Sequence, residues 1–244
     1  MGPKERRARE REEIRSVILD AAREMFATEG YDAVTMRRIA EKIEYSPTAI
    51  YFHFRDKDAL IKELCMADFL ALAQQFMKIS QIKDPLERLR RAGLAYIDFG
   101  MQNPNHYRLM FMTPHPPIEF DGEDEARKGN PEEDAYAFVK EIIAAGIEEG
   151  CFRGEMKELD LIAQIVWAGV HGVISLQIVK HIDDWVDWKP LKKRATFMIE
   201  TLIEGLRSER VAASGEQGDR ASTASTQSAA QKSARRSPPP ARPE

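Results

Sequence analysis

Cysteine is scarce in this sequence, and no segment has the composition of a signal peptide. Only Cys65 and Cys151 occur among 244 residues, far apart and in apolar surroundings. Because secreted proteins use cysteine mainly in disulfides, this usage indicates a reducing compartment. The charged N-terminus also lacks the apolar core that directs secretion. We therefore expect a cytoplasmic protein whose cysteines are reduced core residues.

Long apolar runs are missing as well. The longest candidate, residues 161–179, is interrupted by Gln164, His171 and Gln177. A membrane-spanning helix needs about 20 predominantly apolar residues. The sequence therefore predicts no membrane partner.

Motifs that carry enzyme chemistry are also lacking. The sequence contains no glycine-rich phosphate loop, nucleophile elbow or zinc-ligand spacing. Its five histidines form neither an i, i+4 pair nor a cluster with cysteine. The acidic loop over residues 119–134 is interpreted as a solvated segment rather than a catalytic carboxylate pair. We expect no catalytic residue, no metal and no cofactor.

An excess of positive charge is absent from the chain as a whole but present at its start. The formal net charge is −4, which does not indicate a nucleic-acid binder. Within the first eleven residues, however, Lys4 and four arginines outnumber two glutamates. Such a segment is usually a solvated terminus, yet it is also where an arm that reaches into a DNA groove would lie. We expect residues 1–10 to form a basic arm.

What the sequence does contain is helical periodicity, with 43% apolar residues to fill a core. Strand-like alternation is not found, so an all-α fold is predicted. About nine helices are expected, over residues 11–28, 36–42, 47–54, 57–80, 85–102, 104–112, 132–149, 158–181 and 188–208. The segment 209–244 is rich in Ser, Ala, Gln and Arg and is predicted to be disordered.

Residues 35–54 have the pattern of a helix-turn-helix. Thr35 and Ser46 can cap two short helices. At 100° per residue, Ile50 and Phe54 fall on one face of the second helix and should pack against the first. The outward surface is then Pro47, Thr48, Ala49, Tyr51 and Phe52. Small residues followed by aromatic ones suit a major groove; the alternative is a helical hairpin whose outward rings pack on a neighbouring subunit.

The stretch GYDAVTMRRIAEKIEYSPTAIYFHFRDKDALI, residues 30–61, resembles the signature of the TetR/AcrR family of bacterial one-component regulators. The matching positions are Gly30, Tyr31, Thr35, Arg37, Ile39, Ala40, Ser46, Ile50, Tyr51, His53, Phe54, Lys57 and Leu60. The resemblance implies a DNA-facing set of Thr35, Arg37, Ser46, Pro47, Thr48, Ala49, Tyr51, Phe52, His53 and Lys57. Within that set it places Tyr51, His53 and Lys57 on phosphates, and Arg37, Pro47 and Thr48 nearest the bases.

The turn between the two short helices departs from the family pattern. It is commonly Ala-Gly-Val in such proteins and is Ile43-Glu44-Tyr45 here. If Glu44 takes the left-handed conformation that glycine favours, the cost is about 1 kcal/mol.

The resemblance also implies a domain division, with a DNA-binding domain over residues 11–55 and a ligand-binding and dimerisation domain over 56–208. The helix expected over 158–181 carries two apolar stripes, more than the few neighbouring helices of one chain can cover. A partner subunit is the simplest explanation, and a fully intrachain core is the alternative. The expected dimer interface, part of a four-helix bundle, is Ile165, Ala168, Gly172, Leu176, Val179, Met198 and Leu202.

Two further segments, "HYRLMF" and the Trp167…His171-Gly172 pattern, resemble a Trp-His-Gly subclass of TetR C-terminal domains. Aromatic and methionine side chains in these regions could line a cavity for a small apolar or amphipathic effector. The candidates are Phe99, Tyr107, Met110, Phe111, Tyr136, Phe138 and Trp167, with His171 as a polar anchor. The alternative is that all are ordinary core residues and that His171 bonds a backbone carbonyl.

Together these features predict a homodimeric, sequence-specific DNA-binding regulator. We expect a repressor of nearby genes that binds a pseudo-palindromic operator in double-stranded DNA and is released by a small hydrophobic effector. The alternatives are a ligand-responsive activator, a small-molecule-binding or interaction protein that reuses the helical fold, and an enzyme of unrecognised type.

Overall fold

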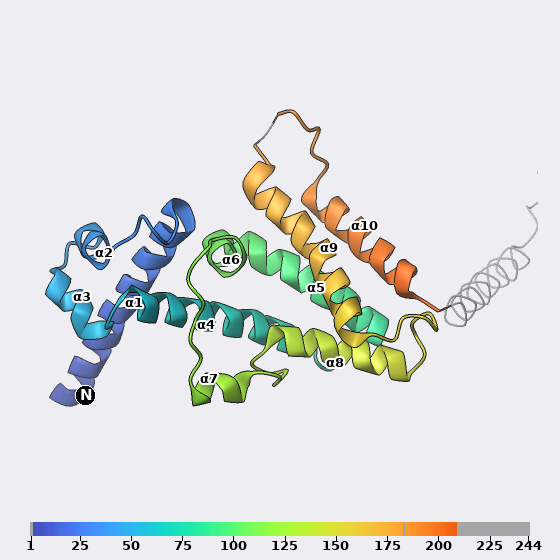
Figure 1. Cartoon of the computed structure of the whole chain (residues 1–244), viewed down its shortest axis with the longest axis horizontal. Helices are drawn as coiled ribbons and strands as arrows, with labels where there is room; N and C mark the ends of the chain where they lie inside the picture. The colour runs from blue at the N-terminus through green and yellow to red at the C-terminus, as the bar shows by residue number, and fades with distance from the viewer. Residues whose placement is uncertain (1, 183, 209–244) are drawn as a thin grey trace, which may run out of the picture.

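The computed structural model describes residues 2–182 and 184–208, and every regular element in that part is an α-helix (Figure 1). These residues form ten helices: α1 (Pro3–Glu29), α2 (Met36–Lys42), α3 (Pro47–His53), α4 (Lys57–Met77), α5 (Pro85–Gln102), α6 (Pro104–Phe111), α7 (Gly122–Arg127), α8 (Ala135–Glu148), α9 (Leu159–Lys180) and α10 (Leu191–Leu206). The all-α prediction is confirmed. The additional helix is α7, inside the acidic loop. The tail predicted to be disordered lies outside the described residues.

The first helix begins at Pro3 rather than at residue 11, so the segment expected to be an arm is helical. The Gly2 amide donates to Glu5 Oε2 at 2.8 Å, which satisfies one free amide of the first turn. Ion pairs at i, i+4 follow: Arg6–Glu10 at 3.7 Å and Arg9–Glu13 at 3.4 Å. The apolar periodicity begins only at Ile14, whereas capping and ion pairs extend the helix further back.

The two short helices begin at the residues expected to cap them. Thr35 Oγ1 accepts from the Arg38 amide and Ser46 Oγ from the Ala49 amide, both at 3.2 Å. In the turn between them, Glu44 has φ of 60°, the left-handed conformation anticipated from the missing glycine. The backbone strain expected at this position is therefore present.

The N-terminal head has a core of its own. Ile50 and Phe54 are buried as their spacing predicted, against residues of α1, α2 and α4. Leu109 of α6 is fully buried in the same cluster. In Figure 1, α2 and α3 lie beside α1 at one end of the molecule. The head core is thus completed by a helix that follows the head by about 50 residues in the sequence.

A buried charge cluster joins the head to the rest of the fold. Asp68 of α4 is only 2% exposed. Its Oδ1 lies 3.1 Å from Arg23 Nη2 of α1 and 2.8 Å from His106 Nδ1 of α6. A buried carboxylate needs partners of this kind to offset the loss of hydration, so these three helices are held together at one point.

The helices α9 and α10 pack side by side at the far end from the head (Figure 1). By length and composition, α9 could cross a membrane. The polar residues that were expected to exclude this do not lower its mean hydropathy enough. However, Ile162, Val166, Val170 and Val173 are buried against the body of the chain. Core helices of soluble proteins pass the same test, so α9 is weak evidence for a membrane span.

Candidate nucleic-acid interface and ligand cavity

The outward surface of α3 is the first candidate site. Pro47, Thr48, Tyr51 and Phe52 are exposed, and Ala49 is half-buried. None of them belongs to the head core. Close to them, Arg37 of α2 is exposed and donates from Nε to Glu41 Oε1 at 2.9 Å. The structure thus exposes small and aromatic side chains on α3 and a basic side chain on the neighbouring α2.

Lys57, expected on a phosphate, is engaged within the fold. Its Nζ donates to the carbonyl oxygens of Tyr31 at 3.0 Å and Val34 at 3.1 Å. The ammonium also lies 3.8 Å from the centroid of the Tyr31 ring. These contacts fix the start of α4 against the connection between α1 and α2. An ammonium has three N–H donors, so one remains for an external acceptor.

His53, the other inward-leaning member of the expected set, has a ring nitrogen, Nδ1, that is buried without a hydrogen-bond partner among the described residues. Burial lowers the pKa of His53, and the nearby Arg11 and Arg15 lower it further. In the DNA-free chain these surroundings disfavour the charged imidazolium, and the contact of His53 with phosphate stays a prediction.

Two arginines of α1, which the sequence analysis did not single out, hold α3 in place. The Arg15 guanidinium lies 4.3 Å from the Phe54 ring centroid, donates to the His53 carbonyl at 3.1 Å and pairs with Glu63. The Arg11 guanidinium lies 5.1 Å from the centroid of Phe52, which is 69% exposed. Both contacts depend on the crossing of α1 and α3, which local sequence patterns do not reveal.

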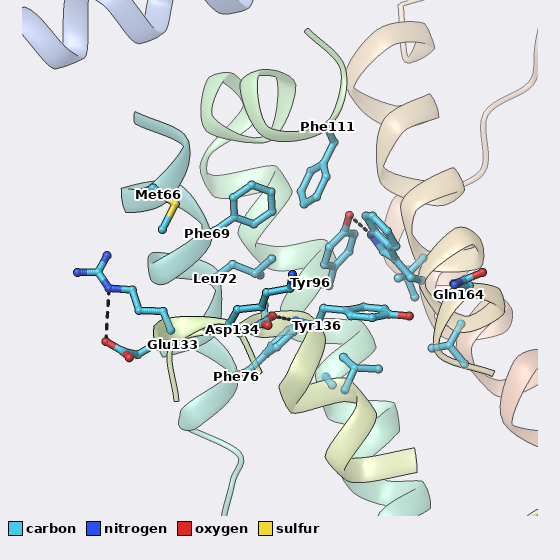
Figure 2. A pocket seen from close by; sticks show the side chains of 18 of the residues that line it. Met66, Phe69, Leu72, Phe76, Tyr96, Phe111, Glu133, Asp134, Tyr136 and Gln164 are labelled. Atoms are coloured by element: carbon cyan, nitrogen blue, oxygen red, sulfur yellow. Dashed lines mark hydrogen bonds and ion pairs between the residues drawn. The ribbon is translucent and has the colours of Figure 1, made fainter. Parts of the chain in front are cut away.

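The second candidate site is a cavity of about 590 Å³ in the helical body (Figure 2). This volume is in the range typical of small-molecule sites, roughly 300–1,000 Å³. Its wall is predominantly apolar and aromatic and comes from α4, α5, α6, α8 and α9. The apolar lining includes Met66, Phe69, Leu72, Phe76, Leu89, Tyr96, Phe111, Tyr136, Val139, Val166, Trp167 and Val170.

Three of the eight residues expected to bind ligand line this cavity: Phe111, Tyr136 and Trp167. Phe99, Tyr107, Met110 and Phe138 are buried in the core instead, and His171 lies behind the wall. The cavity thus gathers only part of the expected set, because composition does not show which face of a helix meets the cavity. Tyr96 and the α4 residues were missed for the same reason.

A hydrogen-bonded chain of four side chains runs from the cavity wall into the core behind it. Trp167 Nε1 donates to the Tyr96 hydroxyl at 2.9 Å, which lies 3.0 Å from the Tyr107 hydroxyl. The Tyr107 hydroxyl in turn lies 2.5 Å from His171 Nδ1. Burial lowers the pKa of His171 and raises the pKa of Tyr96 to about 12.

The Tyr96 hydroxyl also lies 3.3 Å from His171 Nδ1, so the two phenols and the imidazole form one closed cluster. Each hydroxyl can donate one hydrogen bond and accept others, and a neutral imidazole has one donor and one acceptor nitrogen. His171 thus belongs to a network that sets the orientation of Trp167 and Tyr96 in the wall. It neither bonds a carbonyl through Nδ1 nor lines the cavity.

The rim of the cavity comes from the segment expected to be a solvated loop. Asp124, which borders the cavity, pairs with Lys62 of α4 at 2.6 Å. Arg127 lies 3.9 Å from Glu133, a pair drawn in Figure 2. The segment therefore forms one side of the cavity. Part of its charge, which suggested solvation, is held in the ion pairs of Asp124 with Lys62 and of Arg127 with Glu133.

One face of α9 is left uncovered by the described residues 2–182 and 184–208. Leu161, Ile165, Leu176 and Val179 are exposed, while the opposite stripe is buried. Ala168 is also exposed, and Gly172, half-buried, has open space where a side chain would begin. Met198 and Leu202 of α10 are half-buried at its side. The fold thus leaves a continuous apolar strip on the surface, as the two-stripe pattern indicated.

Comparison with known proteins identifies both halves of the chain. Residues 18–64 match the family model for bacterial regulatory proteins of the tetR family, and residues 89–202 match the model of a tetracyclin repressor-like C-terminal domain. An HTH-type transcriptional repressor of Mycobacterium tuberculosis is 52% identical over 54 residues, 22% of this chain and 29% of that protein. The HTH-type transcriptional regulator UidR of Escherichia coli is 29% identical over 94 residues, 38% of this chain and 42% of UidR. The chain thus matches less than half the length of these curated relatives.

A solved structure extends the similarity to most of the chain. The TetR family transcriptional regulator PfmR of Thermus thermophilus superposes with a TM-score of 0.59 over 78% of this chain and 96% of that one. The sequence identity is 21%. At that identity the likeness concerns the fold alone.

Proposed function

Because this chain belongs to the TetR family of bacterial transcriptional regulators, we propose that it is a cytoplasmic repressor released from its operator by a small ligand. Proteins of this family act by binding DNA and are not enzymes. The observation that carries the proposal is that α4 belongs to both sites. Its Leu60 and Leu64 lie in the head core, and its Phe69 and Phe76 line the cavity.

The DNA contact is assigned to α3. Its exposed N-terminal residues, Pro47 and Thr48, are small enough to approach base edges, and Tyr51 extends beside them. Phosphates flanking the groove are bound by the hydroxyls of Thr35 and Ser46, by Tyr51 and by the remaining N–H of Lys57. Arg37 reaches the edge of the same groove. Contacts of both kinds are needed, since phosphates fix position and bases give specificity.

A homodimer fits this mode of binding. The uncovered apolar strip of α9, with the adjacent part of α10, supports a four-helix interface between two copies. Gly172 would allow the partner helix to approach closely at its centre. Two heads would then occupy successive major grooves of a pseudo-palindrome, about 34–36 Å apart. The proposed division is a DNA-binding unit up to residue 55 and a ligand-binding and dimerisation unit over residues 56–208.

The ligand is proposed to be apolar or amphipathic, since the cavity wall offers few polar groups. A ligand that fills the cavity pushes on Phe69 and Phe76, and through α4 on the head. The bound ligand would favour a head spacing that does not match the operator. If this coupling amounts to 1–3 kcal/mol, operator affinity falls about 5- to 150-fold.

A mobility-shift experiment with the DNA upstream of the chain's own gene tests the proposal. The full chain should retard this DNA at salt and competitor concentrations at which an unrelated duplex of equal length stays free. A hydrophobic ligand found by screening should then release it. In vitro transcription from the same DNA measures the sign of regulation. Absence of any sequence preference would refute the proposal.

A further inference from the structure

Basic residues follow one face of α1 over its first turns. At 100° per residue, Lys4, Arg7 and Arg11 lie within about 60° of one another around the helix. All glutamates of this segment lie about 90° or more from the centre of that face. These are Glu5, Glu10, Glu12 and Glu13. We call Lys4, Arg7 and Arg11 the basic stripe.

The basic stripe is the continuation of the face that α1 turns toward α3. One and two turns further along the same line are Arg15, which contacts Phe54 and His53, and Ile18, which is buried in the head core. Arg11, the last member of the stripe, stands over the exposed Phe52. The first turns of α1, which carry the stripe, run past α3 toward the N-terminus (Figure 1).

Charges on this part of α1 are sorted by face. Arg6 and Arg9 form ion pairs with glutamates one turn later. Among the described residues, no carboxylate lies within ion-pair distance of Lys4 or Arg7, although four glutamates are nearby in sequence. A row of cationic side chains without carboxylate partners gives the surface a local positive potential, which attracts an anionic partner.

The length of the stripe suits a nucleic-acid backbone. Seven residues of helix separate Lys4 from Arg11, about 10 Å at 1.5 Å per residue. DNA carries one phosphate per 3.4 Å of helix axis on each strand, so a stripe of about 10 Å is long enough to meet more than one phosphate. An element that is rigid and already fixed against α3 binds such a backbone in a defined register.

We propose that Lys4, Arg7 and Arg11 bind DNA phosphates that flank the major groove entered by α3. The inference rests on the proposed DNA-binding function and adds a second contact surface to each head. Arg11 joins the two surfaces, since its guanidinium is seated on Phe52 of α3. Because the contact is to phosphates, it strengthens binding without changing which sequence is preferred.

The test measures the salt dependence of operator affinity for the full chain, on a duplex defined by footprinting upstream of its gene. Each phosphate contact contributes about 0.9 to the slope of log K against log salt concentration. Lys4→Gln/Arg7→Gln should therefore lower the slope by about 1.8. Between 50 and 200 mM salt its affinity should fall about 12-fold less than that of the wild type.

The matched control is Arg6→Gln/Arg9→Gln, which removes the same charge from the ion-paired face and should keep the wild-type slope. Equal slopes for Lys4→Gln/Arg7→Gln and the wild type would overturn the inference, as would equal reductions in both double variants. In either case the wild type still binds its operator, so the proposed function stands. A wild-type chain without sequence-specific binding would overturn both.

Discussion

The Nδ1 atom of His106 lies 2.8 Å from Oδ1 of Asp68, and the same oxygen lies 3.1 Å from Arg23 Nη2. Asp68 is buried on α4, while its partners come from α1 and α6. The α6 helix also supplies Leu109 to the head core and Phe111 to the cavity. One carboxylate and its two partners thus tie together the three helices that connect the head to the cavity.

Asp68→Ala should destabilise the chain by roughly 3–5 kcal/mol, because it leaves Arg23 without its buried counter-charge. Urea denaturation followed by circular dichroism measures the free energy of unfolding. Asp20→Ala is the matched control, since Asp20 also pairs with Arg23 at 3.0 Å but is exposed. That variant should change the free energy by less than about 0.5 kcal/mol. Similar losses in both would contradict the role given to Asp68.

Glu44→Gly should stabilise the head by about 0.5–1 kcal/mol, since glycine adopts φ of 60° without the steric cost that glutamate meets. Glu44→Ala keeps the strain while removing the carboxylate, so it serves as the control and should leave stability near that of the wild type. Thermal unfolding of both variants measures the difference. A stabilised alanine variant would show that charge, not backbone conformation, is the cause.

Much of this fold could be predicted from the sequence where caps and apolar periodicity coincide. Thr35, Ser46 and Asp56 each precede a helix, and each side chain accepts from an amide of the first turn. The start of α1 could not be placed in this way because ion pairs rather than apolar residues stabilise it. Nor could α7, which has six residues and no apolar face.

The sites were predictable to different degrees. The outward face of α3 follows from helix geometry alone, because Ile50 and Phe54 must face the core. The role of Lys57 could not be foreseen, since it binds the carbonyls of Val34 and Tyr31, which precede it by 23 and 26 positions in the sequence. In the cavity, the rotation of α5 decides that Tyr96 reaches the wall while Phe99 is buried in the core. That rotation depends on packing against several helices at once.

Gly172→Asp should convert the proposed dimer into a monomer without unfolding it. The position has open space around it within the chain, so the side chain meets no steric obstacle there. In the proposed interface it would place a charge in the apolar strip of α9, without a partner. Light scattering at micromolar concentration measures the mass, and circular dichroism the helical content. Ala144→Asp, at an exposed position of α8, should remain dimeric; a dimeric Gly172→Asp would place the interface elsewhere.

Acidification below about pH 6.5 should lower the free energy of unfolding through His171 and His53. An unfolded histidine takes up a proton near pH 6.5, whereas burial lowers the pKa of both residues in the folded chain. The unfolded state then binds more protons, so stability falls as pH decreases through that window. Each of His171→Asn and His53→Asn should remove part of the decrease between pH 7 and pH 5.5, and the double variant more. Urea denaturation at the two pH values measures this, and an unchanged decrease in the double variant would contradict it.

Val139→Trp should produce a protein that binds its operator but no longer responds to ligand. Val139 is half-buried on α8 and lines the cavity, so an indole at this position occupies the space that a ligand needs. We expect operator affinity to be kept, because one indole anchored on α8 takes up only part of the cavity of about 590 Å³ and does not push on Phe69 and Phe76 of α4 as a ligand that fills the cavity does. Nile red, a neutral apolar dye, measures occupancy by fluorescence, and a mobility shift measures operator affinity. We expect dye binding to weaken at least about tenfold, a loss of about 1.4 kcal/mol, with operator affinity kept. Ala144→Trp adds the same indole on the exposed side of α8 and should retain both activities. If Val139→Trp bound dye as the wild type does, the ligand would occupy a different cavity.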